Sequence, residues 1–239
     1  MKYLFFVFLF GVCSCLDSDG SENYWKPIYD GKDHGKNPIE KPCASEDLNC
    51  IRYYLAQNSN CVPAYGPAPD PYKIDKLPLE IAHANMTFVP TQVKINGLNK
   101  FKVGNFYINK KTDTLVLELI ILDLDASSPE VIITYHRKGK EPIILKDFSN
   151  VSLTITIPIY HGHLEISGAR VYSYISDKKP KFVMGPESTE SKDPTVKKAN
   201  KELTENIVLT LQEAFLTQGP IYASVLLQST ICNFYHTAS

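Results

Sequence analysis

Cysteines are the residues of this sequence whose chemistry depends most directly on where the protein is found. There are six, and two of them, Cys13 and Cys15, lie within the first 15 residues. The other four are spread along the chain at Cys43, Cys50, Cys61 and Cys232. In an exported protein an even number of cysteines predicts disulfides, whereas in the cytosol the same residues would stay reduced.

The N-terminus indicates export. Lys2 is followed by an apolar run over residues 3–12 and then by Cys13, Ser14 and Cys15, which is the arrangement of a secretory signal peptide over residues 1–15. The run is shorter than the ~20 residues that a membrane-spanning helix needs. We therefore expect a secreted, extracellular protein without stable membrane insertion. Cleavage after Cys15 would leave four cysteines to pair.

No other arrangement of residues points to a catalytic or metal site. His161 and His163 would point to the same side of a strand, but no third metal ligand accompanies them in the sequence. Glu118 and Asp123 lie on a mostly apolar stretch and are interpreted as solvated carboxylates. The sequence has no nucleophile elbow, zinc-binding helix motif or glycine-rich phosphate loop. We expect neither an enzyme nor a bound cofactor or metal.

Two acceptor sequences for N-glycosylation are present, Asn85-Met-Thr and Asn150-Val-Ser. In a secreted chain both asparagines are candidate glycan sites, so the sequence predicts a glycoprotein.

The composition is that of an ordinary globular protein. Of the 239 residues, 44% are hydrophobic and 21% are charged, which is enough apolar material for one sizeable core. The net charge of −1 gives no general attraction for nucleic acid, so nucleic-acid binding is not expected. We expect a polar, extended arm over residues 16–41 and a single domain over residues 42–239.

The domain begins with a short helix and continues as a sheet. Residues 44–57 place Ala44, Leu48, Ile51 and Leu55 on one stripe at helical spacing. Residues 78–183 carry strand patterns. Apolar and polar side chains alternate clearly in 150–160, whereas 114–124 are apolar at both odd and even positions, as in a strand that is covered on both faces. Because the turns between strands are short, the pattern predicts an antiparallel meander rather than βαβ units.

The C-terminal region predicts one long helix over residues 199–236, kinked at Gly219-Pro220. Such a helix would be about 55 Å long, and its second half is apolar nearly all round, so it must be covered. The expected fold is therefore α+β, with a long, strongly curved antiparallel sheet wrapped around one C-terminal helix. Its interior would be either a filled core or a tunnel for an apolar ligand, and periodicity alone does not decide between them.

Two stretches, "KPCASEDLNC" and "GPAPDPYKIDKL", resemble the insect juvenile hormone binding protein family, which includes the takeout-like proteins. The matching positions are Pro42, Cys43, Asp47, Cys50, Gly66, Pro69, Asp70, Pro71, Lys73, Ile74 and Asp75. Further similarities follow at Gly97, Leu98, Tyr135, Gly139 and Pro220. The order and spacing of these pieces are more specific than any one of them.

The resemblance implies the same curved fold, related to the TULIP-like lipid-binding modules, with the short helix as a lid tied by a Cys43–Cys50 disulfide. It also implies a monomeric carrier in insect haemolymph or another extracellular fluid. Its partner would be a small lipophilic ligand such as juvenile hormone, another terpenoid or a fatty acid. The alternative is the same fold without a ligand, acting as an extracellular structural or protein-interaction module.

Candidate ligand-binding residues follow from the lid and the long helix. They are Leu48, Ile51, Leu55, Tyr222 and Val225, together with Tyr135, whose hydroxyl could meet a polar end of the ligand. Each of them could equally be a core residue. With Cys43 and Cys50 paired, Cys61 and Cys232 remain. They would form a second disulfide only if the lid lies over the end of the long helix, and two free thiols or a link to another chain are the alternatives.

Overall fold

The computed structural model describes residues 38–161, 170–177 and 179–234. All of them belong to one unit that runs from His34 to Ser239. Its strands and helices follow in the order β1 (Ile39–Glu40), α1 (Leu48–Asn58), β2 (Val62–Pro63), β3 (Tyr72–Lys76), β4 (Leu79–Ile81), β5 (Met86–Asn96), β6 (Phe101–Asn109), β7 (Thr114–Arg137), β8 (Lys140–His161), β9 (Arg170–Val171), β10 (Tyr174–Ile175), β11 (Lys181–Met184), α2 (Pro186–Thr189), α3 (Pro194–Glu205), α4 (Ile207–Leu226) and β12 (Cys232–Asn233).

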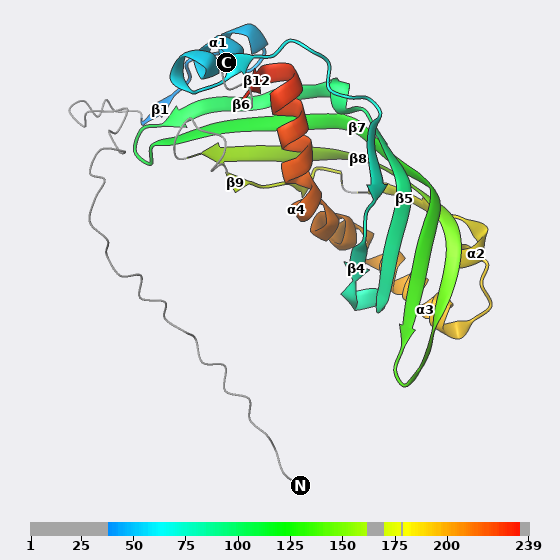
Figure 1. Ribbon diagram of the computed structural model, residues 1–239. Coiled ribbons are helices and arrows are strands. Elements are labelled where there is room, and N and C mark those ends of the chain that lie inside the picture. Colours follow the sequence, from blue (N-terminus) through cyan, green and yellow to red (C-terminus); the bar gives the residue numbers. More distant parts are fainter. Residues whose placement is uncertain (1–37, 162–169, 178, 235–239) are drawn as a thin grey trace, which may run out of the picture. The chain divides into compact units, whose positions relative to one another are not determined.

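The sheet is built on β7 and β8, which pair antiparallel along nearly their whole lengths of 24 and 22 residues. On its other side, β7 pairs with β6 through its first half and with β5 through its second half. The curved antiparallel sheet with a C-terminal helix, predicted from the strand patterns, is confirmed (Figure 1). The sheet is wider than residues 78–183, because β1 pairs with β6 and β3 pairs with β5.

β7 and β8 change direction halfway along their length (Figure 1). Their register shifts between Ile121 and Leu124 and again between Ser128 and Val131, and such bulges bend a strand and increase its twist. The bend separates two groups of buried side chains. The larger contains α1, β6 and the second half of α4, and the smaller contains the start of β5, the β7–β8 hairpin and α3.

The C-terminal helix is not the single rod predicted over residues 199–236. α3 begins at Pro194, where the Asp193 carboxylate accepts hydrogen bonds from the Thr195 and Val196 amides. The helix is interrupted at Asn206, whose side chain donates to the Glu202 carbonyl oxygen (2.9 Å), an arrangement in which asparagine competes with the helical backbone. α4 then continues through Pro220 and ends in a π-helical turn over Leu227–Ile231.

Gly219-Pro220, predicted to kink the helix without ending it, lies inside α4, and it is also a packing site. A Cβ atom on Gly219 would lie 2.5 Å from the side chain of Ser173, so only glycine allows α4 to approach this segment so closely. Helix α1 also differs from its prediction, since it begins at Leu48 rather than residue 44. Asp47 caps it by accepting a hydrogen bond from the Cys50 amide (2.9 Å).

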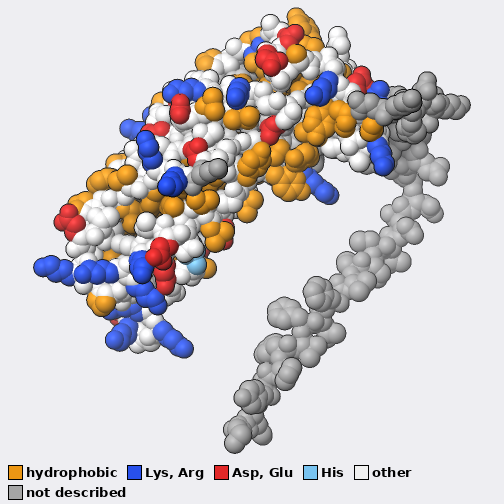
Figure 2. Space-filling view, turned by 180° about the vertical axis from the view of Figure 1, so that it is seen from behind, with side chains coloured by type: hydrophobic (Ala, Val, Ile, Leu, Met, Phe, Trp, Pro, Cys, Tyr) orange, Lys and Arg blue, Asp and Glu red, His pale blue; other side chains and the backbone are white. Residues whose placement is uncertain are grey.

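In the part of the chain that the structure describes, no helix is both long and apolar enough to cross a membrane. Figure 2 shows the outer face, on which Lys and Arg side chains gather at the end formed by the β7–β8 hairpin and α3, while apolar side chains lie in patches along the middle.

Candidate functional site

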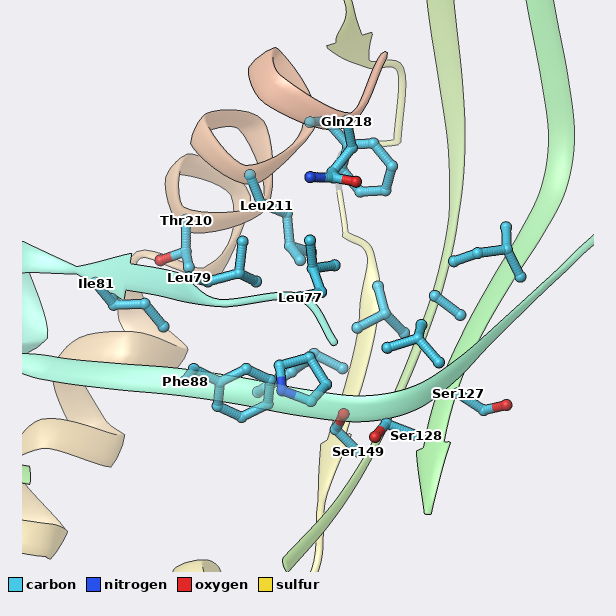
Figure 3. Close-up of a pocket in the computed structure, with 18 of the residues that line it drawn as sticks. Leu77, Leu79, Ile81, Phe88, Ser127, Ser128, Ser149, Thr210, Leu211 and Gln218 are labelled. Carbon is cyan, nitrogen blue, oxygen red and sulfur yellow. The ribbon is translucent and has the colours of Figure 1, made fainter. Parts of the chain in front are cut away.

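A cavity of about 80 Å³ lies between the bend of the sheet and the first half of α4. Side chains from the two groups of buried residues meet around it (Figure 3). Its walls consist of Leu77, Leu79, Ile81, Phe88, Pro90, Val93, Ile95, Ala126, Ser127, Ser128, Ser149, Val151, Phe182, Leu203, Ile207, Thr210, Leu211, Ala214, Phe215, Gln218 and Tyr222.

The bend of the sheet creates the space. Ala126, Ser127 and Ser128 on β7 are small, and Ser149 faces Ser128 on β8. The Ser128 hydroxyl fixes the bulge, because it accepts from the Thr91 amide (3.2 Å) and lies 2.7 Å from the Thr91 carbonyl oxygen. Short side chains at a bend cannot fill the gap between sheet and helix, which leaves the cavity.

Most of the wall is apolar. Two aromatic pairs contribute to it: Phe88 with Phe182, whose ring centroids are 6.1 Å apart, and Phe215 with Tyr222, at 5.9 Å. Burial raises the pKa of the Tyr222 hydroxyl well above its usual range, so this hydroxyl stays neutral. Among the described residues no charged side chain lines the cavity.

The polar groups on the wall differ in how they are satisfied. The Thr210 hydroxyl lies 3.2 Å from both His83 Nε2 and the Asn206 carbonyl oxygen. The Gln218 side chain is only 8% exposed, and its Oε1 atom is buried without a hydrogen-bond partner in the described part of the chain. Figure 3 shows this amide on the helix side of the cavity and Ser128 and Ser149 on the sheet side.

Of the six candidate ligand-binding residues, only Tyr222 lines this cavity. Ile51 and Leu55 are fully buried in the larger core group, and Leu48 and Val225 pack against it. Tyr135 is buried in the smaller group, where its hydroxyl donates to Asn200 Oδ1 (3.0 Å) and burial raises its pKa. The other five therefore lie outside the wall of this cavity, and contact of any of the six with a ligand stays a prediction.

One signal in the sequence could have located the helix side of the cavity. Leu211, Phe215, Gln218 and Tyr222 follow at spacings of four, three and four, which places them on one face of α4. Gln218 is the polar member of this otherwise aromatic and aliphatic stripe. The contribution of β5 and of the β7–β8 bend has no such signal, because it depends on bulges that the strand pattern does not reveal.

The predicted lid, α1, lies against the end of the C-terminal helix, away from the cavity wall. Both disulfides are present, Cys43–Cys50 with Cα atoms 5.7 Å apart and Cys61–Cys232 with Cα atoms 5.6 Å apart. β12 pairs with β2 next to the second disulfide. Arg52 adds a further link, since its Nε and Nη2 atoms donate to the Thr230 carbonyl oxygen at 2.9 and 2.8 Å.

The two candidate glycan acceptors are both exposed. Asn85 follows the 3-10 turn before β5 and donates to the His136 carbonyl oxygen (2.8 Å), whereas Asn150 lies within β8, opposite Ser127 and Val183. Glycan attachment at either site stays a prediction. His163 lies outside the described residues, as does the side chain of His161, and the described residues contain no group of three potential metal ligands.

Comparison with known proteins supports the fold and revises the family. The crystal structure of Takeout 1 from Epiphyas postvittana superposes with a TM-score of 0.50 at 13% sequence identity, covering 82% of this chain and 95% of that one. The resemblance to takeout-like proteins is thus confirmed for the fold alone. Fibrohexamerin from Galleria mellonella is 26% identical over 210 residues, which are 83% of this chain and 90% of the relative. Residues 39–236 match the Fibroin P25 family, and the chain belongs to that family.

Proposed function

We propose that this chain is a secreted, non-catalytic protein that binds fibroin through its surface. The observation that carries the proposal is the family match, which extends over residues 39–236 and so includes every described strand and helix. The name of that family refers to fibroin. This function corresponds to the interaction module that the sequence left as the alternative to a carrier.

Two features of the structure support an interaction module. The cavity of about 80 Å³ is small beside the ~300–1,000 Å³ of typical small-molecule sites. In addition, the two ends of the domain are joined by the Cys61–Cys232 disulfide, the β2–β12 pair and Arg52. A domain held in this way offers a surface of fixed shape, and a fixed surface loses little conformational entropy when it binds a partner.

Size-exclusion chromatography of the secreted protein with soluble fibroin tests the proposal. We expect the two proteins to elute together, while an unrelated secreted protein of similar mass elutes separately from fibroin under the same conditions. Separate elution of this chain from fibroin at micromolar concentration would contradict the proposed function.

A second candidate function is transport of a small lipophilic molecule, such as juvenile hormone, another terpenoid or a fatty acid. The apolar cavity beside α4 favours it. Native mass spectrometry and organic extraction of the secreted protein test this candidate, because a carrier should release a lipophilic molecule. Protein that yields no such molecule, and binds none when offered, would leave fibroin binding as the remaining candidate.

A further inference from the structure

The buried amide of Gln218 has no partner for its oxygen, although the helix around it is otherwise well packed. A buried acceptor left without a hydrogen bond costs about 1–3 kcal/mol, and nearly all such groups in folded proteins are satisfied. If the Gln218 oxygen never met a hydrogen-bond donor, leucine or methionine at this position would fill the same space without the cost in folding free energy of an unsatisfied acceptor. The position of Gln218 on the cavity wall therefore points to a hydrogen-bond donor that enters the cavity from outside the chain.

A second polar group lies on the same face of α4. Tyr222 is four residues after Gln218, which places the two side chains one helical turn apart. Its hydroxyl makes no hydrogen bond within the described part of the chain, and it stays neutral because burial raises its pKa. An amide oxygen that accepts and a phenol that donates suit a ligand group that both donates and accepts, and an alcohol does both.

The rest of the wall limits the ligand further. Because no charged side chain of the described residues lines the cavity, a carboxylate or an ammonium group would lose its hydration without gaining a counter-ion. The wall also carries the hydroxyl groups of Thr210 and three serines, of which the Thr210 and Ser128 hydroxyls already have hydrogen-bond partners within the described part of the chain. The remaining wall residues, such as Phe88 and Leu211, offer only apolar contact. A cavity of about 80 Å³ holds one end of an elongated molecule, with the remainder outside.

We propose that this cavity binds the hydroxyl-bearing end of a neutral, elongated hydrophobic molecule, and that Gln218 accepts the hydrogen bond from that hydroxyl. The inference rests on the second candidate function, ligand carriage, and adds to it the chemical group that is recognised. It does not depend on fibroin binding.

A pair of isomeric probes tests the proposal. 1-Octanol and heptyl methyl ether have the same atoms, but only the alcohol can donate a hydrogen bond. Isothermal titration calorimetry with the full secreted chain should show that the alcohol binds roughly five- to tenfold more tightly than the ether, as expected for one buried hydrogen bond. Octanoate should bind more weakly than the alcohol at a pH at which it is ionised.

Variants separate recognition by Gln218 from general apolar binding. Gln218→Met keeps the length of the side chain and removes its acceptor, so the affinity for the alcohol should fall to that for the ether. Gln218→Leu makes the same test with a different shape, and thermal unfolding of each variant reports on its fold. Gln228→Met is the matched control, because Gln228 lies in the π-helical turn outside the cavity and bonds to the Ser224 hydroxyl. It should keep the wild-type preference.

The results distinguish the inference from the function on which it rests. Equal affinities of the wild-type protein for the two probes would show that the Gln218 oxygen accepts no hydrogen bond from the ligand. That result would overturn the inference, while carriage of apolar molecules would stand. The same conclusion would follow if Gln218→Met kept the preference for the alcohol. If neither probe bound at all, both the inference and ligand carriage at this cavity would be wrong.

Discussion

Arg52 is the side chain that most directly links the N-terminal helix to the C-terminal end of the fold. Its guanidinium group donates twice to the Thr230 carbonyl oxygen and lies 4.7 Å from the centroid of the Tyr65 ring. That carbonyl belongs to the last turn of the π-helical segment, where backbone oxygens lack partners within the helix. Arginine suits this position because its planar group can donate from two nitrogens at once.

Replacing Arg52 by alanine should therefore weaken the fold more than loss of a surface charge would. We expect the free energy of unfolding in urea to fall by about 1.5–3 kcal/mol, the usual range for hydrogen bonds from a charged group. Arg52→Lys keeps the charge but not the paired donors, and it should recover less than half of the loss. Lys73→Ala, at an exposed position on β3, is the control and should change stability little. A wild-type stability for Arg52→Ala would show that the contact contributes nothing.

Gly219 is a second position where one residue determines how two elements pack. Alanine normally improves a helix interior by about 1 kcal/mol relative to glycine. Here the added methyl group would overlap with Ser173, so Gly219→Ala should instead destabilise the protein by roughly 1–3 kcal/mol. The double variant with Ser173→Gly should recover part of this loss, although it also removes the hydrogen bond from Ser173 to the Phe215 carbonyl oxygen. Additive losses in this double-mutant cycle would mean that the two residues do not interact.

At the scale of elements, the strand patterns predicted the fold class because β7 and β8 are long, and because apolar residues alternate regularly in the second half of β8 and dominate the first half of β7. The helix boundary at Asn206 was missed, since asparagine only weakly disfavours a helix and its side-chain bond to Glu202 cannot be read from the sequence. Pro220 was expected to leave the helix unbroken, and α4 does continue past it. The lid residues Ile51 and Leu55 were correctly expected to be buried, but burial did not distinguish a core from a cavity wall.

The N-terminus of α3 gives a pH-dependent prediction. Hydrogen bonds from the Thr195 and Val196 amides hold the pKa of the Asp193 carboxyl below its ordinary value of 3.8. A lowered pKa means that the ionised carboxylate stabilises the folded state above the unfolded-state pKa, and that this contribution disappears as the pH falls through the folded-state pKa. The loss is therefore confined to pH values below about 4.

Asp193→Asn keeps an acceptor at the cap and removes the charge. At pH 6 the variant should be less stable than the wild-type protein, and the difference should shrink as the pH is lowered below 3.8, measured by urea unfolding at several pH values. Glu46→Gln removes an exposed acid that caps no helix and should show no such trend. A difference that stays constant down to pH 2.5 would show that ionisation of Asp193 does not stabilise α3.

For the whole molecule, the important feature is that the segment from α1 to β2 is joined to the C-terminal end of the fold. Cys61 and Cys232 are 171 residues apart in sequence, and their disulfide encloses the C-terminal helix and every strand of the large sheet except β1. The Cys43–Cys50 disulfide closes a separation of only seven residues at the start of α1. Because a longer loop removes more conformational freedom from the unfolded chain, the two disulfides should differ in their effect on stability.

Replacing each cysteine pair by serines tests this difference. By loop entropy alone, removing the Cys61–Cys232 disulfide should cost about 5 kcal/mol and removing the Cys43–Cys50 disulfide about 2.5 kcal/mol, and strain or residual structure would lower both values. The order of the two losses is the firmer expectation, and urea unfolding of the two double variants measures it. β2 and β12 still pair without the long-range disulfide, so the variant should fold and then unfold at a lower urea concentration. A larger loss on removing Cys43–Cys50 would show that α1, and not the closure of the two ends, limits the stability of the domain.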